Sequence, residues 1–275
     1  MERRSFVALA FALALAACAT AVSPVSAPEA SPGERWIARE YRPQGPGPFP
    51  AIVFMHGCSG LWARDGEPAA IYRSWAELFR ARGYLVVLTD SFRPRGEREV
   101  CTQFPSPVTP QRDRPGDAFA VLQLLARRPD VDAARIYLMG WSHGGSTVLN
   151  TLRADLAPPP GKPRFRAAVA MYPGCRSVGR PYAPWAALLV QSGADDDWTP
   201  AATCRQLVAQ SQGAPMEIDV YPGAGHAFDA PGMPVHFRPE VRNAGSPTGW
   251  GATVGSSPEA RDRAVQRVTN WLATH

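Results

Sequence analysis

The sequence predicts an α/β fold in which a mostly parallel central sheet is flanked by helices on both faces. From Glu34 onward, short runs of β-branched and aliphatic residues alternate with longer amphipathic stretches, the pattern of strands that alternate with helices. Most of the short runs are wholly apolar, which is typical of strands that are buried on both faces. The length of 275 residues and the 45% hydrophobic content favour one large domain.

These patterns place the elements in chain order. The expected strands span residues 36–41, 51–55, 85–89, 136–139, 167–171, 187–191 and 217–221. The expected helices span residues 71–82, 115–127, 145–154, 201–210 and 258–273. The last helix opens with Ser257-Pro258-Glu259, which indicates a side-chain cap followed by Pro at the first helical position. Residues 229–256 are rich in Pro and Gly, and we expect a long functional loop there.

The first eighteen residues are expected to be an export signal. A short positive start precedes twelve apolar residues at 6–17, a run too short to span a bilayer. The run ends in Leu15-Ala16-Ala17-Cys18, which resembles the bacterial lipobox, so we expect lipidation of Cys18; ordinary cleavage that discards Cys18 is the alternative. Residues 19–33 are expected to form a flexible tether. The protein would then lie in the periplasm or cell envelope, attached to the membrane through Cys18.

Four further cysteines stand at 58, 101, 175 and 204, an even number in a chain expected in an oxidising compartment. The coarse topology favours the disulfides Cys58–Cys101 and Cys175–Cys204, because each pair would join neighbouring loops at one end of the sheet. A zinc site is the alternative, but neither a CxxC pair nor a matching His spacing accompanies these cysteines. We therefore expect no metal.

The charge distribution predicts no nucleic-acid partner. The formal net charge is +5 and the pI is near 9.2, but the basic residues are scattered along the chain. They form no clustered run that would follow a phosphate backbone, and no stacking aromatics are interleaved with them.

A motif with catalytic chemistry occurs at 140–144, Gly140-Trp141-Ser142-His143-Gly144, between an expected strand and an expected helix. This strand–turn–helix context is the one that a nucleophile elbow requires. Because the turn is tight, Gly140 and Gly144 would let the strand and the helix approach while the Ser142 hydroxyl projects above the sheet. We expect Ser142 to be a catalytic nucleophile.

A serine hydroxyl needs a general base, and the base needs an orienting carboxylate. An expected strand runs into Asp195-Asp196-Asp197, and the next strand runs into a Gly-rich loop that carries His226. The order Ser, acid, His is that of hydrolases with a nucleophile elbow. Each of the three aspartates is a candidate acid, and a helix cap near Pro200 is the alternative role for the others.

Two backbone amides are expected to stabilise the oxyanion of the reaction. The first is the amide of His143, which follows the nucleophile. The second is the amide of Cys58 in His56-Gly57-Cys58-Ser59-Gly60, a segment that resembles a His-Gly oxyanion loop after an expected strand. We expect His56 itself to be a structural residue of this loop rather than a catalyst.

Several segments together resemble the dienelactone hydrolase family of the α/β-hydrolase superfamily. They are His-Gly-Cys-Ser-Gly at 56–60, Asp-Ser-Phe-Arg-Pro-Arg-Gly at 90–96, Gly-Trp-Ser-His-Gly-Gly at 140–145, Tyr-Pro-Gly-Cys at 172–175, Asp-Asp-Trp-Thr-Pro at 196–200 and Tyr-Pro-Gly-Ala-Gly-His-Ala-Phe-Asp at 221–229. The resemblance implies an α/β-hydrolase fold, with residues 34–275 as a single catalytic domain. It also implies Asp196 as the acid, four residues before Pro200, and His226 as the base. Founding members carry Cys where this chain has Ser142, which favours a general carboxylesterase over the namesake reaction.

The expected activity is hydrolysis of a small-molecule ester or lactone through an acyl-enzyme, without a metal or organic cofactor. Arg93 and Arg95 follow an expected strand at the end of the sheet where ligands bind, and could hold a substrate carboxylate. The alternative is that they are solvated or cap backbone carbonyls. Further candidates for substrate contact are His56, Trp141 and Trp198. Alternatives are an amidase, peptidase or acyltransferase with the same triad, or a non-catalytic envelope protein of this fold. The sequence indicates no oligomeric state.

Overall fold

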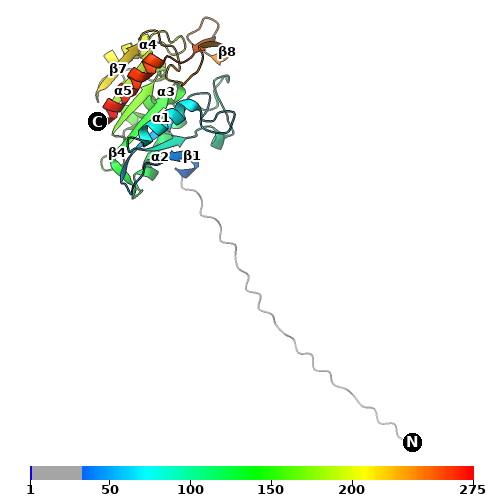
Figure 1. Ribbon diagram of the computed structural model, residues 1–275, viewed down its shortest axis with the longest axis vertical. Coiled ribbons are helices and arrows are strands. Elements are labelled where there is room, and N and C mark those ends of the chain that lie inside the picture. The colour runs from blue at the N-terminus through cyan, green and yellow to red at the C-terminus, as the bar shows by residue number, and fades with distance from the viewer. Residues whose placement is uncertain (2–32) are drawn as a thin grey trace.

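A computed structural model describes Met1 and residues 33–275, and its centre is a seven-stranded sheet (Figure 1). The strands lie in the order β1-β3-β2-β4-β5-β6-β7, and only β1 runs antiparallel to its neighbour. Their bounds are β1 Ile37–Tyr41, β2 Phe49–Met55, β3 Leu85–Thr89, β4 Val131–Trp141, β5 Ala167–Met171, β6 Ala187–Gly193 and β7 Met216–Tyr221. The predicted α/β fold with a mostly parallel sheet is confirmed.

Helices cover both faces of this sheet. The bounds are α1 Ala70–Arg80, α2 Arg114–Leu125, α3 His143–Thr151, α4 Ala201–Ala209 and α5 Pro258–Thr274, with short 3-10 turns at Glu34–Trp36, Arg93–Arg95, Ala154–Leu156 and Cys175–Ser177. Successive strand side chains point to opposite faces, so on β2 Val53 and Met55 pack with α2, α3 and α4. Ile52 and Phe54 pack on the other face with α1 and α5, which lie across the sheet in Figure 1. Two apolar layers therefore hold the strand ends rigidly.

The structure differs from the sequence predictions in two segments. The expected loop at 229–256 contains an antiparallel hairpin of β8 (His236–Arg242) and β9 (Trp250–Val254). Helix α5 begins at the expected Pro258, but the side chain of Ser257 makes no capping hydrogen bond, so the predicted side-chain cap is wrong. The hairpin lies over the end of the sheet where the functional loops gather, because the Arg242 amide donates to the Cys101 carbonyl.

Both expected disulfides are present. Cys58 is bonded to Cys101, and Cys175 is bonded to Cys204. The first joins the loop after β2 to the loop that follows the 3-10 turn Arg93–Arg95, and the second joins the loop after β5 to α4. The disulfide prediction is therefore confirmed.

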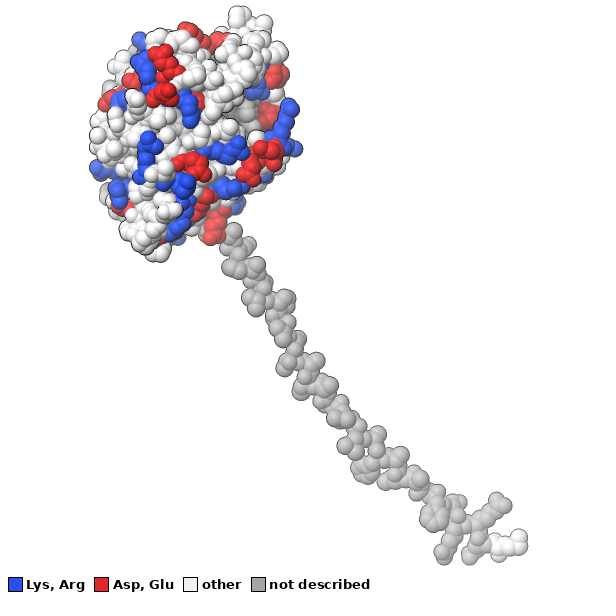
Figure 2. Space-filling model, in the orientation of Figure 1, with Lys and Arg blue, Asp and Glu red and all other residues white. Residues whose placement is uncertain are grey.

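The predicted export signal at 1–18, Cys18 and nearly all of the predicted tether at 19–33 lie outside the described residues. Within the described part of the chain, no helix has both the length and the apolar content needed to cross a bilayer. Figure 2 shows basic and acidic side chains interspersed over the visible face, as the scattered charges of the sequence suggest.

Candidate active site

Ser142 lies in a tight turn between β4 and α3, with φ 52° and ψ −112°, a backbone conformation that L-residues rarely adopt. The Ser142 amide donates to the Met171 carbonyl at 2.9 Å, which ties the turn to β5. A Cβ on Gly140 would lie 2.3 Å from the Gly144 carbonyl oxygen, and one on Gly144 would lie 1.9 Å from the Met55 carbonyl oxygen. The two glycines therefore allow the close approach expected from the motif.

The loops after β6 and β7 bring an acid and a base to this turn. Nε2 of His226 lies 2.9 Å from Oγ of Ser142, and Nδ1 of His226 lies 2.8 Å from Oδ2 of Asp196. His226 is 3% exposed and Asp196 is 4% exposed, so the contact between them is shielded from bulk water, whereas Ser142 is partly exposed. The structure thus brings together the three side chains that the sequence proposed as a triad.

The Asp196 carboxylate is held by several donors besides the imidazole. The amides of Trp198 and Thr199 donate to its Oδ1 at 2.9 and 2.8 Å, and the Thr199 hydroxyl donates to Oδ2 at 2.9 Å. Burial tends to raise the pKa of Asp196, but His226 and these hydrogen bonds outweigh it, and the pKa lies below its usual value. Asp196 is therefore ionised at neutral pH, so Nδ1 of His226 donates to it and Nε2 can accept from Ser142.

The neighbouring aspartates do not contact the imidazole. The Asp197 carboxylate accepts hydrogen bonds from the Thr253 amide on β9, at 2.9 and 3.1 Å. Asp195 is exposed. Neither caps α4, because the N-cap residue of that helix is Pro200, without a side-chain cap. The alternative capping role is therefore wrong for both residues.

The loop after β2 lies against the Ser142 turn. A Cβ on Gly57 would lie 3.7 Å from the Cβ of Ser142, and the Gly57 amide donates to the Tyr72 hydroxyl at 2.8 Å. Next to it stands Cys58, fixed by its disulfide to Cys101. In the described part of the chain, the amides of Cys58 and His143 donate to no protein acceptor, which leaves both available to a ligand beside Ser142.

Two cavities meet at Ser142. The first has a volume of about 180 Å³ and a mainly apolar wall that includes Tyr72, Tyr172, Ala230, Met233 and Val254. The second has a volume of about 430 Å³ and is bordered by Val100, Gln103, Phe104, Pro110 and Arg242. Cys58 and Trp198 border both cavities, so Ser142 stands at the junction of two arms of one hollow.

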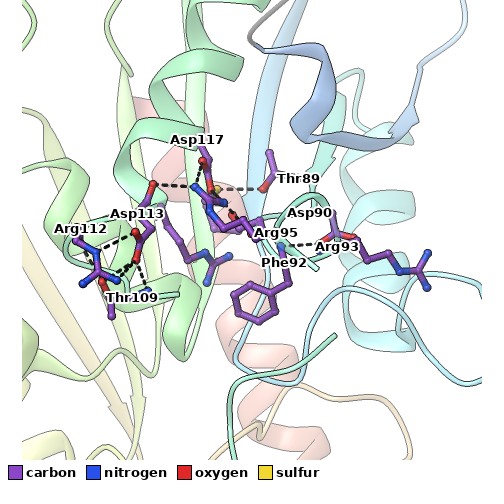
Figure 3. A network of polar contacts seen from close by, with 12 residues as sticks. Thr89, Asp90, Phe92, Arg93, Arg95, Thr109, Arg112, Asp113 and Asp117 are labelled. Carbon is purple, nitrogen blue, oxygen red and sulfur yellow. Dashed lines mark hydrogen bonds and ion pairs between the residues drawn. The ribbon is translucent and has the colours of Figure 1, made fainter. Parts of the chain in front are cut away.

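The other residues predicted to contact substrate have different surroundings. Trp141 lines the smaller cavity and Trp198 lines both, whereas Arg93 and Arg95 line neither. Arg95 forms a bidentate ion pair with Asp117, with both N–O distances 2.8 Å (Figure 3). Arg93 lies over the Trp62 ring. The guanidinium of Arg95 also donates to the Ser91 carbonyl oxygen at 2.7 Å. It is thus already paired within the fold, which agrees with the carbonyl-capping alternative rather than with a role in holding a substrate carboxylate.

His56 is a buried structural residue of its loop, as expected. Its Nδ1 lies 2.8 Å from the Gly57 carbonyl oxygen, and its Nε2 accepts a hydrogen bond from the Ser91 amide at 3.2 Å. Burial, assisted by the charge of Arg114, holds the pKa of His56 well below its ordinary value. The ring is therefore neutral and joins the loop after β2 to the loop after β3.

Sequence reasoning missed a buried carboxylate behind the site. Asp229 is fully buried and accepts hydrogen bonds from the indoles of Trp75 and Trp141 at 2.7 and 2.9 Å and from the Tyr172 hydroxyl at 2.7 Å. Burial raises the pKa of Asp229, although these donors oppose the shift. Its position three residues after His226 was the only sequence signal. It fixes two aromatic walls of the smaller cavity.

No group of three His, Cys, Asp or Glu side chains that could hold a metal ion is found among the residues described by the structure.

Comparisons with known proteins place the chain in a family. A model of the dienelactone hydrolase family matches residues 37–275. An Escherichia coli K12 protein assigned as a carboxymethylenebutenolidase is 26% identical over 239 residues, which cover 80% of this chain and 81% of that protein.

Solved structures show the same fold. A protein from Klebsiella pneumoniae assigned as a dienelactone hydrolase has a TM-score of 0.61 at 24% identity, covering 85% of this chain and 91% of that one. Esterase 2 of Thermogutta terrifontis with bound butyrate has a TM-score of 0.58 at 19% identity, covering 86% and 87%. On its family match and its architecture, the chain belongs to the dienelactone hydrolase family and is a carboxylic ester hydrolase of that kind.

Proposed function

We propose that this protein hydrolyses carboxylic esters through an acyl-enzyme on Ser142, with His226 as general base and Asp196 as its orienting carboxylate. The observation that carries the proposal is the pair of contacts on one imidazole, 2.9 Å to Oγ of Ser142 and 2.8 Å to Oδ2 of Asp196. In this geometry His226 takes the serine proton as Oγ attacks the ester carbonyl, and Asp196 stabilises the imidazolium that forms.

The tetrahedral oxyanion would accept hydrogen bonds from the amides of Cys58 and His143, which have no protein acceptor in the described chain. His226 then returns the proton to the leaving alcohol, and the C–O bond of the ester breaks. A water molecule, deprotonated by His226, attacks the acyl-enzyme and releases the carboxylic acid together with free Ser142. None of these steps requires a redox partner.

The two arms of the site favour an ester with a short acyl group and a larger alcohol. The arm of about 180 Å³ is apolar and suits a small acyl chain, and the arm of about 430 Å³ can take the leaving group. The solved structures of Thermogutta terrifontis esterase 2 include propionate and butyrate complexes, which is consistent with a preference for short acyl groups. A lactone could also be cleaved if its ring fits across the junction at Ser142.

The test is hydrolysis of p-nitrophenyl esters from acetate to laurate by the wild type and by Ser142→Ala. We expect the highest kcat/KM on the short esters and a loss of at least about a thousandfold in the variant. Wild-type turnover by Ser142→Ala would refute the nucleophile. A parallel panel of anilides and acceptor alcohols separates ester hydrolysis from the amidase, peptidase and acyltransferase alternatives, and an inactive wild type would favour a binding protein.

We also propose that the protein is exported and anchored to a membrane through lipidated Cys18. The support is the lipobox-like sequence Leu15-Ala16-Ala17-Cys18 together with two disulfides, which persist in oxidising compartments. Fractionation of cells that express the wild type and Cys18→Ala tests this. The wild type should sediment with membranes and the variant should not; equal distribution of the two would refute anchoring.

A further inference from the structure

A buried arginine links the two segments that carry the proposed oxyanion donors. Arg114 is the first residue of α2 and is 0% exposed. Its Nη1 donates to the carbonyl of His56 at 2.8 Å and lies 2.8 Å from Nδ1 of His143. Because a guanidinium can only donate, Nδ1 of His143 is the acceptor. One nitrogen atom therefore bridges the loop after β2 and the start of α3.

These contacts lie next to the proposed donors. His56 precedes Cys58 by two residues, and the second donor is the amide of His143 itself. The two donors belong to segments that are 85 positions apart, and a rotation or shift of either segment would change the angle between their N–H groups. Oxyanion stabilisation depends on donors placed before the reaction, so this angle matters for the rate.

The surroundings of Arg114 argue against a role in stability alone. In the described chain no carboxylate lies within ion-pair distance of it, and its Nε and Nη2 find no protein acceptor. Burial lowers the pKa of Arg114 to about 10, so the group is still charged at neutral pH. The guanidinium lies 5.2 Å from the centroid of the Phe92 ring, so its partners are all uncharged. A buried charge without a carboxylate partner is costly, and an apolar residue of similar size often serves stability as well or better.

The helix end that carries Arg114 is itself fixed. Arg95 forms its bidentate pair with Asp117 in the first turn of α2, and Asp113 accepts hydrogen bonds from the Thr109 amide and hydroxyl at 2.7 and 3.0 Å (Figure 3). Asp117 is buried, so its pair with Arg95 is shielded from solvent. These contacts hold the base of the Arg114 side chain in place against β2 and α3.

We propose that Arg114 is a positioning residue that sets the relative placement of the Cys58 and His143 amides through its contacts with His56 and His143. The proposal rests on the proposed ester hydrolysis at Ser142. Arg114 touches no reacting atom in this proposal; it acts through the two segments. The loss of the Arg114 guanidinium should therefore impair oxyanion stabilisation specifically.

The test compares p-nitrophenyl acetate with its thionoester, in which sulfur replaces the carbonyl oxygen. Sulfur is a weaker hydrogen-bond acceptor, so the thionoester gains less from the two amides. Arg114→Met keeps an unbranched apolar stem, although a shorter one, and removes the donors. We expect kcat on the oxygen ester to fall about tenfold to a hundredfold with KM little changed, and the ratio of oxygen-ester to thionoester kcat/KM to fall with it.

Two further variants keep the result decisive. Val121→Ala perturbs the buried face of the same helix without touching the site, and it should leave the oxygen-to-sulfur ratio at the wild-type value. His143→Ala retains the backbone amide and removes one acceptor of Arg114, so it should lower the ratio even if Arg114→Met does not fold. A wild-type ratio in His143→Ala and in any folded Arg114 variant would overturn the proposal. Activity in Ser142→Ala would instead overturn the proposed function.

Discussion

Nδ1 of His226 lies 2.8 Å from Oδ2 of Asp196, across 30 residues of chain, whereas Asp195 is exposed and the Asp197 carboxylate binds the Thr253 amide. We expect Asp196→Asn to lower kcat by about four orders of magnitude, because the amide would favour the wrong tautomer of His226. Steady-state kinetics of the three single variants at 195, 196 and 197 would check this. A larger loss in Asp195→Asn or Asp197→Asn would assign the acid differently.

A second prediction concerns the glycines of the turn. Gly144→Ala should abolish activity and strongly reduce the yield of folded protein, because its Cβ would lie 1.9 Å from the Met55 carbonyl oxygen. Gly116→Ala on α2 is the matched control: its Cβ would meet nothing within 4 Å. Ala is favoured over Gly in a helix by about 0.5–1 kcal/mol, so this variant should unfold at a slightly higher temperature. An active, stable Gly144→Ala protein would contradict the close packing of the turn.

The two disulfides should differ in their effect on catalysis. They close loops of 43 and 29 residues, and the loss of either should cost a similar stability of about 3–4 kcal/mol. Cys58 carries one of the proposed oxyanion amides, whereas Cys175 and Cys204 line neither cavity at Ser142. The double variant Cys58→Ser/Cys101→Ser should therefore also lower kcat, by about tenfold or more. The pair Cys175→Ser/Cys204→Ser is the control, measured well below its melting temperature. An equal kcat in the two double variants would show that the Cys58–Cys101 disulfide does not position the Cys58 amide for catalysis.

Acid sensitivity should arise in part from Asp130. Hydrogen bonds from Arg128 and Arg42 lower its pKa against the opposing effect of burial. Since the folded pKa lies below the unfolded value, the ion pairs stabilise the protein above about pH 4 and their contribution is lost as the pH falls further. Asp130→Asn should therefore lower the free energy of unfolding at pH 7 by about 1 kcal/mol or less, and with it the melting temperature. The difference in melting temperature between the wild type and the variant should narrow below pH 4.

Thermal unfolding of the wild type and Asp130→Asn between pH 2 and pH 8 provides the measurement. Asp262→Asn is a suitable control, because Asp262 is exposed on α5 and forms no ion pair among the described residues. A difference in melting temperature that stays constant or widens with acidification would show that Asp130 does not act through its charge.

Local patterns predicted the parts of the molecule that depend on neighbours in sequence. The apolar runs predicted the strands of the sheet. The glycines at 140 and 144 predicted the tight turn that holds Ser142, because only glycine fits at those two positions. The hairpin was missed because β8 reads His-Phe-Arg-Pro-Glu-Val-Arg, with an internal proline and only Val241 fully buried. Such a strand does not show the buried pattern of the central sheet.

The local sequence patterns did not predict contacts between residues that are far apart in the chain. Arg95 stands at a strand end that suits ligand binding, but Asp117, 22 residues later, already satisfies it. Likewise, the local sequence does not distinguish the three adjacent aspartates as candidate acids. The fold distinguishes them, because the turn directs the amides of Trp198 and Thr199 onto Asp196. The choice of Asp196 came from family resemblance rather than from the local pattern.

The hairpin of β8 and β9 contributes side chains to the walls of both cavities but none of the residues proposed for catalysis. Arg238 and Val254 border the smaller cavity and Arg242 borders the larger one, yet the Ser, His and Asp side chains proposed for catalysis all lie elsewhere. Hydrogen bonds to Cys101, Asp197 and Trp198 secure it, whereas its exposed Phe237 and Trp250 are unconstrained by the core. The end of β9 must be kept, because Val254 pairs with His226 and the Gly255 amide donates to the His226 carbonyl at 3.0 Å. A designer of altered selectivity would therefore vary the exposed positions of the hairpin and leave its junction with the His226 loop unchanged.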